Sequence, residues 1–187
     1  MAAPLLWLLE PTQGARDTVI VDTLAAWLAV PADSLALDHA ASGRPLLRGA
    51  DVDISLADCG PLVVLGALPN GRLGVDAEPI DTDLDPARLA ADHFTPGEAA
   101  WLASLPAETR HEAFLRLWTA KEALLKALGV GLPFGLANVE IAVGADGRLS
   151  LAKVLGSAEM AAGWRLAEWR LLTRHGPLRA AVVWTTL

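Results

Sequence analysis

The chain has 187 residues, 53% of them hydrophobic, and a formal net charge of −7, so it is long enough to bury a core and is not a disordered segment. The negative charge argues against general nucleic-acid binding, which requires a basic surface, and no apolar run reaches the roughly 18 residues that span a bilayer. Its single cysteine, Cys59, excludes a disulfide framework or a thiolate zinc site within the chain. The apolar start has no basic residue before it and is not typical of a secretory signal, so a cytoplasmic protein is expected.

The first part of the chain is predicted to form a strand, a helix and a mainly antiparallel set of strands. Residues 17–29 have the pattern of a helix, with Asp17 or Thr18 as its cap and Pro31 beyond its end. Short apolar segments separated by turn residues, such as Asn70-Gly71, are typical of strands. The predicted strands are residues 5–10, 35–39, 44–47, 52–57, 62–68 and 73–78.

The second part opens with helices. Residues 81–91 are polar and are predicted to be a connection, and Thr95-Pro96-Gly97-Glu98 then has the pattern of a capping box. A helix should therefore run from there to about Ser104. A longer helix is expected over residues 106–128, ending at Gly129. The strands expected after it are residues 138–143, 148–154, 164–172 and 178–185.

The two parts follow a similar plan of helix and antiparallel strands, although the sequence shows no residue-level repeat. We therefore predict an α+β fold of two similar α/β halves, each with one or more helices packed on a mainly antiparallel sheet. The N-terminal half is expected to be residues 1–88 and the C-terminal half residues 89–187.

The apolar face of residues 114–129, FLRLWTAKEALLKALG, contains a lysine. At about 100° per residue, Lys121 lies near the centre of a face made by leucine and aromatic side chains. Burying an ammonium costs several kcal/mol unless an anion meets it, so either the Lys121 stem reaches the edge of this face or a negative group lies opposite. Alternatively this is a core helix on which Glu122 simply pairs with Lys126 four residues later.

Two acidic side chains share one face of the predicted strand at residues 73–78. Asp76 and Glu78 are separated by one residue, so their positions lie about 6.6 Å apart on the same side of the strand. Carboxylates placed in this way repel unless a cation lies between them. Magnesium, which prefers oxygen ligands and often binds one or two carboxylates together with phosphate oxygens, would suit them. A solvated sheet face is the alternative.

These segments resemble the two signatures of one enzyme family. Gly74-Val75-Asp76-Ala77-Glu78 and, about forty residues later, Trp118-Thr119-Ala120-Lys121-Glu122-Ala123 are similar to the signatures of the phosphopantetheinyl transferases of the surfactin-synthetase-activating type. The pair is more specific than either signature alone. Further similar segments are Gly43-Arg44-Pro45, Asp53-Ile54-Ser55, Phe94-Thr95-Pro96-Gly97-Glu98 and Gly129-Val130-Gly131-Leu132.

The resemblance implies transfer of the 4′-phosphopantetheine of coenzyme A to a serine of an acyl or peptidyl carrier protein, which leaves 3′,5′-ADP. The family fold has two similar halves in one chain with the active site between them, and a monomer is expected. Asp76, Glu78 and Glu122 would hold Mg²⁺ against the pyrophosphate, and Glu122 would also be the base for the carrier serine. Because such carriers are typically acidic, Arg110 and Arg116 are candidates for a basic docking patch.

The resemblance also implies how coenzyme A is held. Lys121 would take part in catalysis by lying against the pyrophosphate, and Lys126 would be a second phosphate contact. Arg44 stands where the family usually has a basic residue and would contact a coenzyme A phosphate. Ser55 would hydrogen-bond to one.

One departure from the family pattern keeps other functions open. The family usually has serine-histidine-serine where this chain has Ser55-Leu56-Ala57, so a histidine that reaches a coenzyme A phosphate is absent. A module that binds coenzyme A or a carrier protein with little turnover is therefore an alternative. A different Mg²⁺-dependent phosphotransfer or hydrolysis enzyme could also use the same carboxylates.

Overall fold

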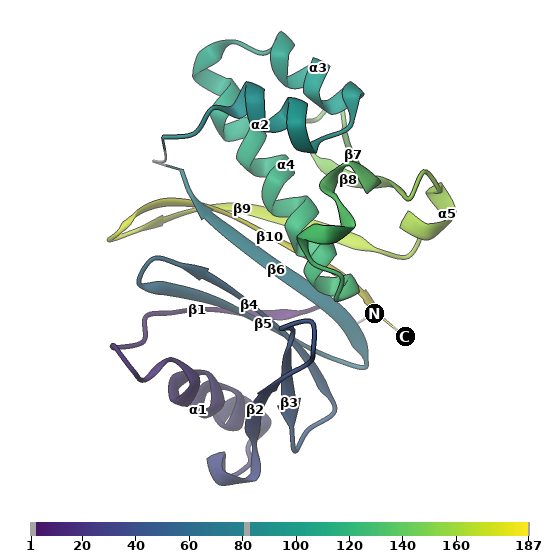
Figure 1. Ribbon diagram of the computed structural model, residues 1–187. Helices are drawn as coiled ribbons and strands as arrows, with labels where there is room; N and C mark the ends of the chain where they lie inside the picture. The colour runs from purple at the N-terminus through teal and green to yellow at the C-terminus, as the bar shows by residue number, and fades with distance from the viewer. Residues whose placement is uncertain (1–2, 81–82, 187) are drawn as a thin grey trace.

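The computed structural model describes residues 3–80 and 83–186, which include two three-stranded antiparallel sheets (Figure 1). In the first sheet, β5 (Leu62–Pro69) lies between β1 (Leu5–Leu9) and β4 (Val52–Cys59). In the second sheet, β10 (Gly176–Thr186) lies between β6 (Gly71–Pro79) and β9 (Arg165–Thr173).

Hairpins and helices complete the molecule. The hairpins are β2 (Ala36–His39) with β3 (Pro45–Arg48), and β7 (Val139–Val143) with β8 (Leu149–Val154). The longer helices are α1 (Arg16–Leu28), α2 (Pro86–His93), α3 (Pro96–Ser104) and α4 (Ala107–Leu128). The shorter ones are η1 (Ala32–Ser34), η2 (Leu132–Phe134), η3 (Leu136–Asn138) and α5 (Ala158–Ala161). Within the described ranges, no helix combines the length and apolar character needed to cross a membrane.

Both parts of the chain follow one plan, in which a strand and a helix precede a hairpin and two further strands. The order β1, α1, β2–β3, β4, β5 corresponds to β6, α4, β7–β8, β9, β10, and corresponding strands take the same places in the two sheets. The predicted α+β fold of two similar halves is therefore confirmed. Because β6 pairs with β10, the sheets divide the chain between β5 and β6, whereas the sequence suggested a boundary at residue 88.

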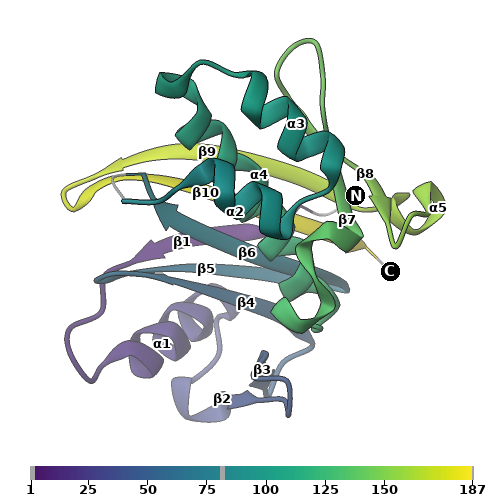
Figure 2. The ribbon, with the colours of Figure 1, turned by 45° about the horizontal axis from the view of Figure 1, so that its top comes forward.

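The layers are held together by three apolar clusters. Leu24 of α1 packs with Leu65 on the outer face of the first sheet, Val64 packs with Val182 between the sheets, and Leu124 of α4 packs with Val183 on the outer face of the second sheet. Figures 1 and 2 show the resulting order, with α1 on one side of the stacked sheets and α2, α3 and α4 on the other. Alternate side chains of a strand point to opposite faces, so β5, buried over nearly its whole length, serves two clusters at once.

The segment predicted as a connection contains a helix. Pro86, interpreted there as a loop residue, occupies the first turn of α2, where its missing N–H costs nothing. Asp85 caps this helix by accepting a hydrogen bond from the Arg88 N–H at 3.1 Å. Residues 81 and 82 of the predicted connection lie outside the described residues. The capping box of Thr95 and Glu98 is present as predicted.

The two halves meet where β4 and β6 lie side by side, and side chains join these strands. Asp53 Oδ2 accepts a hydrogen bond from the Leu73 N–H at 2.8 Å, and Ser55 Oγ accepts one from the Val75 N–H at 3.0 Å. Residues 53 and 55 face the same side of β4, so they meet alternate donors of β6. This seam fixes β6 against the first half immediately before Asp76.

Candidate active site

A glycine lets helix α4 lie directly on strand β6. A Cβ atom built on Gly74 would come within 1.9 Å of the Ala123 carbonyl oxygen and 2.5 Å of the Ala127 nitrogen, both backbone atoms of α4. Only a residue without a side chain allows this approach. It brings Glu122 of α4 over the face of β6 that carries Asp76 and Glu78.

The three carboxylates share one poorly solvated region, and the charge of Asp76 raises the pKa of the other two. Burial raises the pKa of Asp76, which is only 6% exposed. Burial, followed by the charge of Asp76, raises the pKa of Glu78, which a hydrogen bond from the Trp118 side chain opposes. The same two causes raise the pKa of Glu122 from 4.5 to about 7. Glu122 is therefore close to half-ionised at neutral pH.

Lys126 is the cation of this group. Its Nζ donates to Asp76 Oδ1 at 2.8 Å and to the Leu56 carbonyl oxygen at 3.3 Å, so it joins α4 to both β6 and β4. Its charge lowers the pKa of Asp76, Glu78 and Glu122 alike. The alternative interpretation of the helix, in which Glu122 pairs with Lys126, is replaced by a pair between Lys126 and Asp76.

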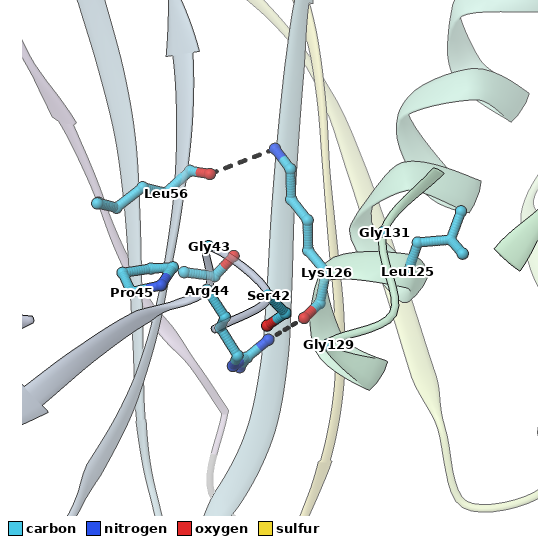
Figure 3. Close-up of a pocket in the computed structure, with 10 residues that line it drawn as sticks. Ser42, Gly43, Arg44, Pro45, Leu56, Leu125, Lys126, Gly129 and Gly131 are labelled. Atoms are coloured by element: carbon cyan, nitrogen blue, oxygen red, sulfur yellow. Dashed lines mark hydrogen bonds between the residues drawn. The ribbon is translucent and has the colours of Figure 1, made fainter. Parts of the chain in front are cut away.

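A pocket of about 170 Å³ lies beside Lys126, between the two halves. The pocket is lined by the loop at Ser42 and Gly43, by Leu56, and by the end of α4 with Gly129 and Gly131. Figure 3 shows the Lys126 side chain extending from α4 toward Leu56. Lys126 therefore connects the pocket, which it lines, with the carboxylates, since it also pairs with Asp76.

Comparison with known proteins identifies the family. Residues 72–183 match the model of the 4′-phosphopantetheinyl transferase superfamily, a range that includes Asp76, Glu78 and Glu122. The chain belongs to this superfamily. The resemblance seen in the sequence is thereby confirmed.

Curated relatives carry the same description. A putative 4′-phosphopantetheinyl transferase of Synechocystis is 33% identical over 135 residues, which cover 71% of this chain and 53% of the relative. A 4′-phosphopantetheinyl transferase of Bacillus pumilus is 30% identical over 146 residues, which cover 73% of this chain and 60% of the relative. The chain therefore spans roughly half to three fifths of the length of these relatives.

A solved structure of holo-[acyl-carrier-protein] synthase from Neisseria meningitidis is also similar. Its TM-score is 0.47 at 18% identity, and the match covers 62% of this chain and 98% of that chain.

The carboxylates of this superfamily member fit a divalent cation in one specific respect. Asp76 Oδ2 is buried and, among the described residues, has no hydrogen-bond partner. A buried oxygen left in this way costs roughly 1–3 kcal/mol, which a bound cation would relieve. Within residues 3–80 and 83–186, no three acidic, histidine or cysteine side chains already converge as a ligand set. Instead Lys126 contacts Asp76, and the donors present are the oxygens that magnesium prefers.

Lys121 lies away from the other predicted site residues. Its side chain is fully buried, and its Nζ donates to Glu98 Oε2 at 2.7 Å, to the Leu136 carbonyl at 3.1 Å and to the Val139 carbonyl. All three ammonium protons are thus used inside the protein, with the Phe94 ring 4.8 Å away. Burial lowers the pKa of Lys121, and Glu98 opposes this. The predicted anion opposite Lys121 is a carboxylate of the protein, and this structure does not support the implied contact with a pyrophosphate.

Arg44 and Ser55 line the pocket, but their polar atoms hold the halves together. The Arg44 guanidinium donates to the Lys126 carbonyl (Figure 3). It also donates to Asp53 Oδ2 at 2.6 Å and to the Leu73 carbonyl at 2.9 Å. Ser55, 2% exposed, accepts from Val75 as described above. The sequence analysis did not assign a role to Asp53, although Asp53 belongs to one of the segments similar to the family. Its position two residues before Ser55, on the same side of the strand, could have indicated that both side chains contact β6.

The predicted basic docking patch has other contacts. Arg110 donates to the carbonyls of Leu102, Ala103 and Leu105 at the end of α3. Arg116 pairs with Glu168 of β9 and donates to the Gly147 carbonyl. Both guanidinium groups therefore bind the protein itself, and the structure does not support them as a free basic patch.

Proposed function

We propose that this protein transfers the 4′-phosphopantetheine of coenzyme A to a serine of an acyl or peptidyl carrier protein. Membership of the superfamily and the descriptions of its relatives support this proposal. The single observation that carries it is the geometry of the site. Lys126 lines the pocket between the halves, and its charge also acts on three carboxylates whose pKa is raised.

In the proposed reaction, Glu122 accepts the proton of the carrier serine hydroxyl. A carboxyl group whose pKa is about 7 suits this role, because it is ionised in part at neutral pH and still basic enough to take a proton. The serine oxygen forms a bond to the phosphorus that bears pantetheine, and the bond from this phosphorus to the departing 3′,5′-ADP breaks. Lys126 supplies positive charge at the pocket edge, where that phosphate would lie.

We propose further that Asp76, Glu78 and Glu122 hold Mg²⁺. Asp76 Oδ2, which has no hydrogen-bond partner among the described residues, and the raised pKa of each of the three carboxyl groups support a cation there. When bound, Mg²⁺ would neutralise charge on the departing phosphate. Because both halves of one chain line the pocket, we propose that the protein acts as a monomer. The lone, buried Cys59 is consistent with the proposed cytoplasmic location.

Intact-mass spectrometry of an apo carrier protein incubated with coenzyme A, Mg²⁺ and this protein tests the proposal. A phosphopantetheine adduct on the carrier is expected, with transfer reduced at least ~100-fold in Asp76→Ala. Asp92→Ala, which removes an exposed carboxylate of α2 that lies 3.8 Å from Arg88, is the matched control and should transfer normally. Binding of coenzyme A without an adduct would instead indicate a binding module. Breakdown of coenzyme A without transfer would indicate a different phosphotransfer or hydrolysis enzyme.

A further inference from the structure

Lys126 is the only cation that acts on all three carboxylates of the cluster formed by Asp76, Glu78 and Glu122, as far as the described residues go. It is paired with the most buried of them, Asp76, whose side chain is 9% exposed, while the lysine side chain itself is 32% exposed. One oxygen of Asp76 therefore accepts from the ammonium, and the other has no hydrogen-bond partner within residues 3–80 and 83–186. The pairing leaves the cluster only partly neutralised.

The remaining charge matches a divalent ion. When all three carboxyl groups are ionised, they and one ammonium carry a charge of about −2, and repulsion between like charges in a poorly solvated site is costly. A hard cation held by Asp76 would also repel the ammonium that lies 2.8 Å from Oδ1. The metal and Lys126 therefore compete for the same carboxylate.

Lys126 has a place to go when it is displaced. Its second contact, the Leu56 carbonyl at 3.3 Å, lies on the pocket wall, and Leu56 and Lys126 both line the pocket (Figure 3). A lysine side chain has a flexible stem of four carbons, so a partly exposed ammonium can turn from Asp76 into this space. Arg44, the other cation lining the pocket, is held by Asp53 and two backbone carbonyls and cannot replace it.

We propose that Lys126 is an internal counter-ion that a divalent cation displaces from Asp76, so that metal binding releases the ammonium into the pocket to meet an anionic ligand. This inference rests on the proposed function, because it takes the carboxylate cluster as the metal site. It makes the metal and a phosphate-bearing ligand bind with positive coupling, and by linkage each must strengthen the other equally.

Mn²⁺ affinity, measured by calorimetry at pH 8 without coenzyme A, tests the competition. Lys126→Met should bind Mn²⁺ at least ~10-fold more tightly than the wild type, because the competing charge is gone while the stem is kept. Lys153→Met removes a lysine from the exposed pair with Glu140 on β7–β8 and is the matched control for net charge. It should leave the Mn²⁺ affinity unchanged.

Amine labelling of the wild type tests the displacement without any variant. This test therefore remains valid even if Lys126→Met folds poorly. The lysines of the chain are Lys121, Lys126 and Lys153. Saturating Mn²⁺ should raise the labelling of Lys126 several-fold, leave Lys153 unchanged as an internal standard, and leave the buried Lys121 unlabelled.

The outcomes separate this inference from the proposed function. Equal or weaker Mn²⁺ binding by Lys126→Met, or unchanged labelling of Lys126, overturns the counter-ion role even if the wild type forms the carrier adduct. Failure of the wild type to bind Mn²⁺ overturns the inference and the proposed metal site together. Absence of the carrier adduct is the separate result that refutes the transferase activity.

Discussion

Replacing Gly74 by alanine perturbs the approach of α4 to β6 without touching any charged group. The new Cβ would lie 1.9 Å from the Ala123 carbonyl oxygen, whereas ordinary van der Waals contact begins at 3.4 Å, so the helix and strand must separate by about 1.5 Å. The neighbour is a backbone atom and cannot rotate away. Overpacking of this kind costs typically about 1–3 kcal/mol, and a displacement of about 1 Å in a catalytic site can reduce the rate by ~100-fold.

Urea unfolding and carrier transfer, measured on the same preparation, check this prediction. Gly97→Ala is the matched control, because no atom lies within 4 Å of its would-be Cβ and its φ is not positive. That variant should be as stable as the wild type or more stable by roughly 0.4–1 kcal/mol, with normal transfer. If Gly74→Ala retains both full stability and full transfer, the reasoning that close packing of α4 on β6 assembles the carboxylates is refuted.

The remaining predictions concern charge. Glu122→Gln should stabilise the metal-free protein at pH 8 and progressively less toward pH 5. The folded-state pKa of Glu122 is about 7 against an ordinary 4.5, so the wild type loses stability as the pH rises between these two values, and the loss is complete above pH 7. Thermal unfolding across this pH range measures the effect, and a gain in stability that does not change with pH would contradict the prediction. Lys121→Met should lower the free energy of unfolding by roughly 3–5 kcal/mol in urea, because Glu98 is left buried without its counter-charge; a variant as stable as the wild type would show that the pair is dispensable. Leu56→His should lower the KM for coenzyme A by about 10-fold with little change in kcat, because an added contact to a remote phosphate acts equally on ground and transition states. Steady-state kinetics in which neither constant changes would mean that no phosphate lies near residue 56.

Local signals in the sequence predicted the elements well. The Thr95 and Glu98 capping box fixed the start of α3, and Gly129 ends α4 in the left-handed conformation, with a φ of 74°. Each of these signals depends on neighbours within four residues, which a sequence displays directly. The helix at Pro86 was missed because proline suits both a loop and the first turn of a helix, and only the packing of α2 on α3 and α4 decides between them.

Long-range partners could not be predicted in the same way. The helical pattern identified Lys121 as a buried cation that needs an anion, but Glu98 lies 23 residues earlier and was interpreted only as part of a capping box. Glu98 performs both roles, since its Oε2 accepts a hydrogen bond from the Thr95 N–H at 2.9 Å and one from Lys121 Nζ at 2.7 Å. The orientation of Arg44 toward Asp53 and α4, rather than into the pocket, likewise depends on how the halves meet. No spacing within the sequence encodes that arrangement.

The pairing of β6 with β10 determines when the carboxylate cluster can form during synthesis. Asp76 lies opposite Ala181, about 100 residues further along the chain, whereas the strands of the first sheet all lie within residues 5–69. The first sheet can therefore assemble early, while β6 leaves the ribosome with one edge unpaired until β10 follows. Contacts so distant in sequence form slowly and leave strand edges open to aggregation in the meantime. A nascent chain that stops before β10 has Asp76, Glu78 and Glu122 but no sheet to hold them together, so the carboxylate cluster is one of the last features of the molecule to appear.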